Sequence, residues 1–111
     1  MANYTFNSLK AEYAHQWAHM NINNNRVDAA NSQADKIIAG MAKYQIIEAL
    51  TGVPWYVIGL MHLRESDCDF GTHLHNGDPL TARTIHVPKG RPLEGRAPFD
   101  FTKSAVDALT M

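Results

Sequence analysis

The most informative stretch of the sequence is Val53-Pro-Trp-Tyr-Val-Ile-Gly-Leu-Met-His-Leu-Arg-Glu-Ser66. Gly52 stops any helix before it, and Pro54 suits the first turn of a new one. Apolar residues then continue almost without interruption to Leu63, a pattern typical of a helix buried in a core. We therefore predict a short core helix that ends on a carboxylate, Glu65, and leads directly into a polar loop.

Glu65 is the first candidate for chemistry. Helical spacing places it on the same face as Ile58 and Met61. It also lies at the helix C-terminus, where the helix dipole disfavours negative charge. A hydrophobic wall at this place would favour the protonated form that a general acid needs. The structural alternative is a glutamate that turns out to solvent, or one that pairs with Arg64 or a lysine.

Length and composition predict one small domain over residues 1–111. The chain has 10 Lys and Arg against 11 Asp and Glu, and they are scattered, so neither a nucleic-acid partner nor a membrane partner is indicated. The one cysteine, Cys68, has no internal partner for a disulfide, which fits folding in a reducing cytoplasm. No signal-peptide pattern and no membrane-spanning apolar run is visible. We expect synthesis in the cytoplasm, with delivery to any outside target by another route.

Helical patterns flank the central stretch. Residues 8–50 predict N-terminal helices, the first capped by Ser8 and the second running from about residue 26 to 50 with Gly40 inside it. The first has an apolar stripe that we expect to be core: Leu9, Tyr13, Trp17 and Met20. A last helix is expected over residues 102–111, and its apolar pattern is still running at the final residue.

A β-hairpin is predicted after the central helix, so that residues 54–92 form a helix plus a hairpin. Residues 72–75 and 82–87 have strand character, and Asn76-Gly77 is a strong turn signal between them. In the second strand Ile85 and Val87 would share one face and Thr84 the other. The predicted fold class is therefore α+β and mainly helical.

Two kinds of site are compatible with the loop. A glycosidase needs a second carboxylate, and Asp78 is the best placed to position water, although Gly77-Asp78-Pro79 is also ordinary turn chemistry. Alternatively, His73 and His75 on one side of a strand, with Asp78, would form a metal-dependent hydrolase site. The structural alternative is that both histidines bond to the backbone or contact substrate.

A longer pattern resembles a known family. Glu65-Ser66, followed by Thr72-His-Leu-His-Asn-Gly-Asp-Pro-Leu-Thr81 and Val87-Pro-Lys-Gly-Arg-Pro92, is similar to bacterial and phage proteins of the lysozyme family, which belong to the lysozyme-like superfamily of peptidoglycan-cleaving enzymes and phage endolysins. The resemblance covers about residues 43–111 and is strongest over residues 54–92.

The resemblance implies a helical fold whose hairpin forms one wall of a saccharide cleft. Glu65 would be the general acid that cleaves the β-1,4 bond between N-acetylmuramic acid and N-acetylglucosamine, by hydrolysis or by lytic transglycosylation, without a cofactor or metal. Asp78 would assist it. The residues expected to contact the glycan are Ser66, His73, His75, Asn76 and Thr84. A non-catalytic module that binds the cell wall is a further alternative.

One departure from the family pattern concerns the C-terminal end. Members of the family continue past the position of Met111 with helices that close the other side of the cleft. We therefore expect a fragment, a homo-oligomer or a second chain that completes the cleft. Residues 17–20 of the N-terminal helix are another candidate to cover the exposed core.

Overall fold

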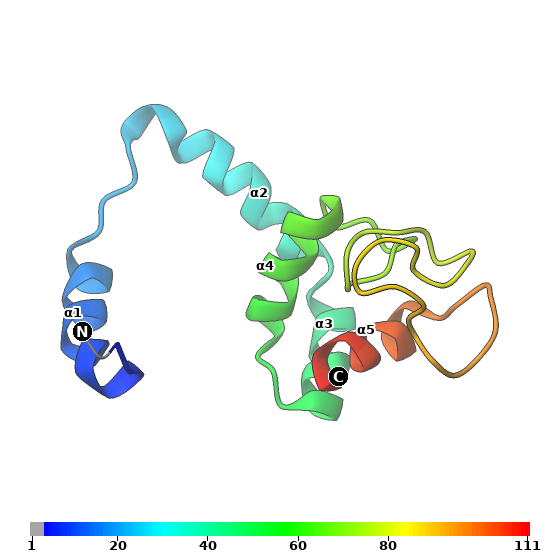
Figure 1. Ribbon diagram of the computed structural model, residues 1–111. Coiled ribbons are helices and arrows are strands. Elements are labelled where there is room, and N and C mark those ends of the chain that lie inside the picture. Colours follow the sequence, from blue (N-terminus) through cyan, green and yellow to red (C-terminus); the bar gives the residue numbers. More distant parts are fainter. Residues whose placement is uncertain (1–3) are drawn as a thin grey trace. The chain divides into compact units, whose positions relative to one another are not determined.

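The computed structural model describes residues 4–111 and is mainly helical (Figure 1). Its elements are α1 (Phe6–His19), a short 3₁₀-helix η1 (Asn24–Arg26), α2 (Val27–Ala39), α3 (Met41–Thr51), α4 (Trp55–Ser66) and α5 (Phe101–Thr110). The chain divides into two compact units, residues 1–30 and 31–111. The helical class is confirmed, and the two units are described separately.

The first unit contains α1, which begins three residues earlier than Ser8 would set it. Thr5 is the N-cap, and its hydroxyl accepts from the Ser8 backbone N–H at 3.1 Å, in a capping box. No residue of this helix is buried. Tyr13, Trp17 and Met20 are exposed, so the prediction that their stripe is core is wrong for this unit.

The predicted long helix is two helices, α2 and α3, which meet at Gly40. A Cβ atom on this residue would lie 2.8 Å from the rings of both Tyr44 and Phe70. The absence of a side chain therefore lets the two rings approach the backbone, and they stack with their centroids 5.5 Å apart. The sequence predicts one helix through Gly40, so the break at this residue corrects that prediction.

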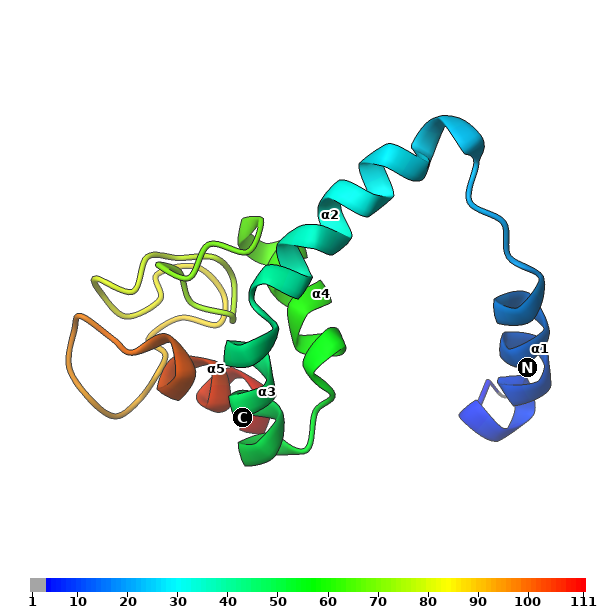
Figure 2. The ribbon, with the colours of Figure 1, turned by 180° about the vertical axis from the view of Figure 1, so that it is seen from behind.

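The second unit is built around α3, which packs against both α4 and α5, and the three helices lie together in both views (Figures 1 and 2). Gly52 ends α3 in the left-handed conformation, with φ of 77°, and Pro54 is the N-cap of α4, as the sequence predicts. The buried apolar side chains come from these helices, from α2 and from the loop: Ile37, Tyr44, Ile47, Ile58, Leu74, Leu80, Phe101 and Ala105.

A chain of polar groups crosses this core. The Tyr44 hydroxyl donates to Nδ1 of His62 at 2.7 Å, and Nε2 of His62 donates to the carbonyl oxygen of Asp69 at 2.9 Å. Burial lowers the pKa of His62 and raises that of Tyr44, so both side chains stay neutral at pH 7. These two hydrogen bonds through His62 fix the end of α4 to the loop that follows it.

The central helix α4 is buried on one side only. Ile58, Gly59 and His62 face the core, whereas the apolar side chains opposite them are exposed: Tyr56, Val57, Leu60 and Met61. The prediction of a helix buried nearly all round is therefore wrong. In the described part of the chain no single helix is long and apolar enough to cross a membrane, although α3 and α4, bent by 116°, pass that test as a pair.

The predicted β-hairpin does not form. Within residues 4–111 the loop between α4 and α5 contains no strand, and its one bridge joins Thr72 to Pro79. Ile85 and Val87 are exposed, and Thr84 is buried instead. The physical reason is that a carboxylate oxygen of Asp78 accepts the backbone N–H groups of Ile85 and His86, which a hairpin would need for its ladder.

The last helix, α5, begins at Phe101, one residue before the predicted start. Asp100 is its N-cap and accepts from the Lys103 backbone N–H at 2.9 Å. Its buried face is Phe101, Ser104 and Ala105, which closes the core under the loop.

Candidate functional site

Glu65 lies in the last turn of α4 and is exposed to solvent. The helix ends at Asp67 in the left-handed conformation, with its N–H bonded to the carbonyl of Leu63 at 2.9 Å. Gly77, with φ of 84°, lies against this end, because a Cβ atom there would be 2.5 Å from the carbonyl oxygen of Glu65. The glycine thus lets the loop turn approach the backbone of Glu65, whereas the carboxylate of Glu65 is exposed and the expected hydrophobic wall does not bury it.

The carboxylate of Glu65 has no hydrogen bond or ion pair to any residue among 4–111, whereas most acids near it are bound. Asp67 forms a 2.8 Å salt bridge with Lys36. Asp69 accepts from the backbone N–H of Gly71 at 2.8 Å. Asp78 and Asp107 are also occupied, as shown below. In the segment from α4 to α5, Glu65 and Glu94 are therefore the acids that have both carboxylate oxygens unbound.

Asp78 is a buried clamp for the loop. One oxygen accepts from the backbone N–H groups of Ile85 and His86 at 2.8 and 2.9 Å and from the Asn76 amide at 3.2 Å. The other faces Nδ1 of His86 at 2.6 Å. Burial alone would raise the pKa of Asp78, but the bonds from His86 and Ile85 outweigh it and lower the pKa to about 2. Both oxygens are occupied, so the water-positioning role predicted for this residue does not fit its geometry.

His73 is a core residue rather than a surface ligand. Its Nε2 donates to the carbonyl oxygen of Ala82 at 2.7 Å, and its Nδ1 accepts from the Ser104 hydroxyl at 2.6 Å. The residue is fully buried. Because neither nitrogen reaches the surface, the prediction that this imidazole contacts a glycan is not supported, and the alternative of a backbone-bonded histidine is the one that the geometry favours.

His75 is the first member of a partly buried triad with Asp107 and Arg91. Its Nε2 donates to the Asp107 carboxylate at 2.7 Å, and Arg91 donates two bonds to the same carboxylate, at 3.0 and 2.6 Å. Burial lowers the pKa of His75. Burial alone would raise the pKa of Asp107, but the hydrogen bonds from His75 and Arg91 outweigh it and lower the pKa. The side chain of His75 is inaccessible, so a direct contact with substrate is not supported for it either.

The sequence did not point to Arg91 or Asp107 as partners of the loop. Arg91 lies in a Pro- and Gly-rich segment, and Asp107 is one acid in an apolar helix. The sequence contains one weak signal for this pairing. An acid on the inner face of an amphipathic helix, such as Asp107, is rarely buried without a cation, so a cationic partner could have been expected. Nδ1 of His75 is buried and has no hydrogen-bond partner among residues 4–111.

The remaining predicted contacts hold the backbone of the loop. The Ser66 hydroxyl lies 3.4 Å from the carbonyl oxygen of Asp69. The amide group of Asn76 donates to the carbonyl of His86 at 3.1 Å. The Thr84 hydroxyl is buried, donates to the carbonyl of Pro88 at 2.5 Å and accepts from the N–H of Arg91 at 2.8 Å. These side chains shape the loop instead of lining an open cleft.

The metal-site alternative has little geometric support. No group of three or more His, Cys, Asp or Glu side chains in the described part of the chain is arranged to hold a metal ion. His73 has both nitrogens occupied, and Asp78 has both oxygens occupied. Binding a metal through these residues would therefore require the loop to lose its clamps.

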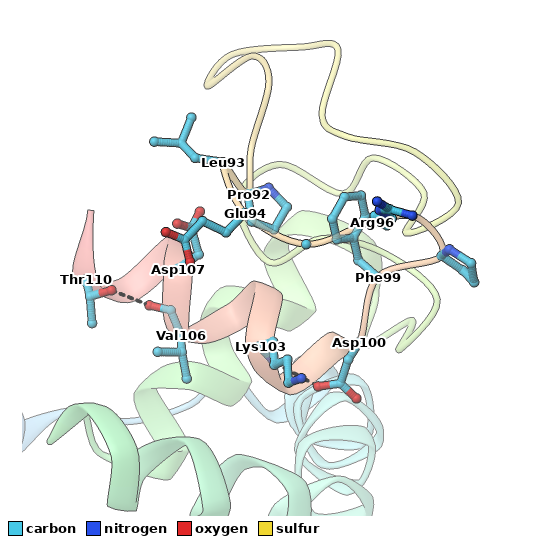
Figure 3. Close-up of a pocket in the computed structure, with 12 residues that line it drawn as sticks. Pro92, Leu93, Glu94, Arg96, Phe99, Asp100, Lys103, Val106, Asp107 and Thr110 are labelled. Carbon is cyan, nitrogen blue, oxygen red and sulfur yellow. Dashed lines mark hydrogen bonds between the residues drawn. The ribbon is translucent and has the colours of Figure 1, made fainter.

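A pocket of about 630 Å³ lies between α5 and the loop that precedes it (Figure 3). Its lining combines apolar and charged side chains: Pro92, Leu93, Glu94, Gly95, Arg96, Pro98, Phe99, Asp100, Lys103, Val106, Asp107 and Thr110. Glu65 does not line it. The two are linked through the loop, because His75, two residues before Gly77, bonds the Asp107 carboxylate that forms part of the pocket.

Comparison of the chain with protein families, with curated proteins and with solved structures finds no match.

Proposed function

We propose that this protein cleaves the glycan strands of peptidoglycan, with Glu65 as the general acid. The observation that carries the proposal is the contrast among its acids. Both carboxylate oxygens of Glu65 are unbound at the end of α4, where its backbone carbonyl lies against Gly77, whereas each neighbouring aspartate has an oxygen in a salt bridge or bound to a backbone N–H group. We take the substrate from a resemblance: the Glu65-Ser66 segment and the following loop resemble lysozyme-family proteins, which cleave peptidoglycan.

The proposed chemistry is proton transfer to the glycosidic oxygen. Glu65 donates its proton as the bond to the anomeric carbon breaks and positive charge develops on the sugar ring. A bound glycan would exclude water from the carboxyl group of Glu65. Hydrolysis and lytic transglycosylation share this first step.

In this mechanism Asp78 is a positioning residue. It holds the turn that contains Gly77 by binding the backbone of Ile85 and His86, and so keeps the loop against the end of α4. His73, Thr84 and Asn76 have the same kind of role. The glycan would then contact the outer surface of this clamped loop, next to Glu65.

The test is the substitution Glu65→Gln, which keeps the size of the side chain and removes the proton. We expect cleavage of cell-wall substrate to fall by about 10²- to 10⁴-fold, the usual contribution of a general acid, with an unchanged melting temperature. Asp35→Asn is the matched control, since Asp35 is also exposed and unpaired within the described residues and does not line the pocket next to α5. Full activity in Glu65→Gln, or an equal loss in the control, would overturn the proposal.

A further inference from the structure

The pocket between α5 and residues 92–100 has a charge pattern that the proposed function does not use. Glu94 and Asp107 lie at one end of it in Figure 3, and Arg96 lies at the end where Phe99 is found. Lys103 projects from α5 into the same lining. The middle is apolar, with Pro98, Phe99 and Val106 among its lining residues. Asp100 adds an acid next to Lys103, and one of its oxygens accepts from the Lys103 backbone N–H. Arg96 is thus separated from Glu94 and Asp107 by an apolar section, whereas Lys103 has an acid beside it.

The free charges of the pocket are available to a ligand. The side chains of Arg96, Lys103 and Glu94 make no hydrogen bond or ion pair with any residue that the structure describes. Asp107 is different, because Arg91 and His75 already occupy its carboxylate. A ligand therefore meets two unpaired cations, one unpaired carboxylate and the second oxygen of Asp100, beside the Asp107 carboxylate that Arg91 and His75 hold.

These charged side chains make a sugar ring a poor ligand for the pocket. Sugars bind mainly through an open aromatic face and neutral hydrogen bonds. Here the guanidinium of Arg83 lies over the ring of Phe99, 5.2 Å from its centroid, and the ring of His73 is 5.6 Å away from it. Phe99 is thus packed by its own chain, whereas the cations beside it remain unpaired.

We propose that this pocket binds a short peptide that carries both carboxylates and an amine, and specifically the peptide stem of peptidoglycan. Arg96 and Lys103 would receive carboxylates, Glu94 would receive the ammonium group, and the apolar section would receive side-chain methyl and methylene groups. A volume of about 630 Å³ is in the range of sites for small ligands and accommodates a few amino-acid residues. The choice of the stem peptide, among peptides of this chemistry, rests on the proposed function.

The arrangement would allow one substrate to use both regions. A stem peptide leaves the glycan at each N-acetylmuramic acid, so a peptide seated in the pocket places a glycan bond near the loop. The loop connects the pocket to the catalytic carboxylate, through His75 on Asp107 and Gly77 on the Glu65 carbonyl. The pocket would therefore increase the preference of the enzyme for peptide-bearing glycan over bare glycan.

The test measures binding of a soluble stem tetrapeptide, containing γ-D-glutamate and diaminopimelate, to the purified full chain by calorimetry or NMR titration. The double variant Arg96→Gln/Lys103→Gln should bind at least about tenfold more weakly, since charge-assisted bonds are lost. The matched control is Lys10→Gln/Lys89→Gln, which removes two exposed cations outside the pocket and should bind as the wild type does.

A second arm compares cleavage of intact peptidoglycan with cleavage of glycan strands from which an amidase has removed the peptides. The pocket variant should lose activity on the first substrate and keep it on the second. Absence of peptide binding, equal binding in the pocket and control variants, or equal loss on both substrates would overturn the inference. Peptide binding that persists while Glu65→Gln keeps full lytic activity would leave the peptide site standing and reject the proposed glycosidase.

Discussion

The end of α4 and the loop that follows it use carboxylates in opposite ways. Glu65 is exposed and unpaired among residues 4–111, whereas Asp78 is buried and has both oxygens occupied. An unpaired carboxylate can change its protonation state without disturbing the fold, and a clamped one cannot. Glu65, on the regular helix, thus keeps both oxygens open to a ligand, whereas Asp78, in the irregular loop, binds backbone N–H groups that strand pairing would otherwise use.

The largest expected effect comes from removing the acid of α5 that binds both His75 and Arg91 of the loop. Asp107→Ala leaves Arg91 and His75 without their partner, and removing one member of a partly buried charged group should cost about 3 kcal/mol of unfolding free energy. In a domain of this size that corresponds to a fall in melting temperature of about 10–20 °C. Thermal unfolding measures it, and a change below about 1 kcal/mol would show that the triad is not a structural clamp.

The second prediction concerns the contact between the two regions. Gly77→Ala adds a Cβ atom 2.5 Å from the carbonyl oxygen of Glu65 at a φ of 84°, so we expect a loss of about 2 kcal/mol together with reduced activity. Gly90→Ala is the control, because its φ is 79° and nothing lies within 4 Å of the added atom. Equal effects of the two substitutions on activity would contradict a role for the Gly77 contact.

The third prediction uses pH to sharpen the contrast. The pKa of Asp78 falls from 3.8 to about 2 on folding, so its ionised form stabilises the fold. This stabilisation is fully present above pH 3.8 and is lost as the pH falls through about 2. Asp78→Asn should lower the unfolding free energy at pH 7 by about 2 kcal/mol and flatten its dependence on pH between 4 and 2. Denaturant unfolding at several pH values measures this, and an unchanged slope in the variant would assign the acid sensitivity elsewhere.

The smallest expected effect comes from the first unit. Trp17 is 76% exposed, and no residue of α1 is buried, so Trp17→Ala should change the unfolding free energy by less than about 0.5 kcal/mol. Differential scanning calorimetry of wild type and variant checks it. A larger loss would show that the apolar stripe of α1 is covered in solution, and would restore the core role that its spacing predicts.

The sequence predicts the helices well where local signals decide them. Gly52 and Pro54 set the junction of α3 and α4, and Asp100 sets the start of α5 within one residue of the prediction. The prediction of a β-hairpin is wrong because strand formation in this segment depends on tertiary hydrogen bonds. Alternation and Asn76-Gly77 favour strands, but the Asp78 carboxylate takes two of the N–H groups that a ladder needs.

The candidate site was predictable in part for the same reason. The position of Glu65 at the end of a helix follows from local pattern, and so does the turn at Gly77. The burial of His73 and His75 depends on Ser104 and Asp107, which are 31 and 32 residues further along the chain. Such long-range hydrogen bonds have no signature in local spacing, and the same holds for the pairing of Arg91 with Asp107.

The central claim is that Glu65 protonates a glycosidic bond, and mass spectrometry of the products from purified peptidoglycan tests it most directly. With wild-type protein we predict glycan fragments that end at N-acetylmuramic acid, and with Glu65→Gln a loss of these fragments by about 10²- to 10⁴-fold at an unchanged melting temperature. Fragments cut within the stem peptides, or the same glycan fragments released by Glu65→Gln at the wild-type rate, would contradict the account.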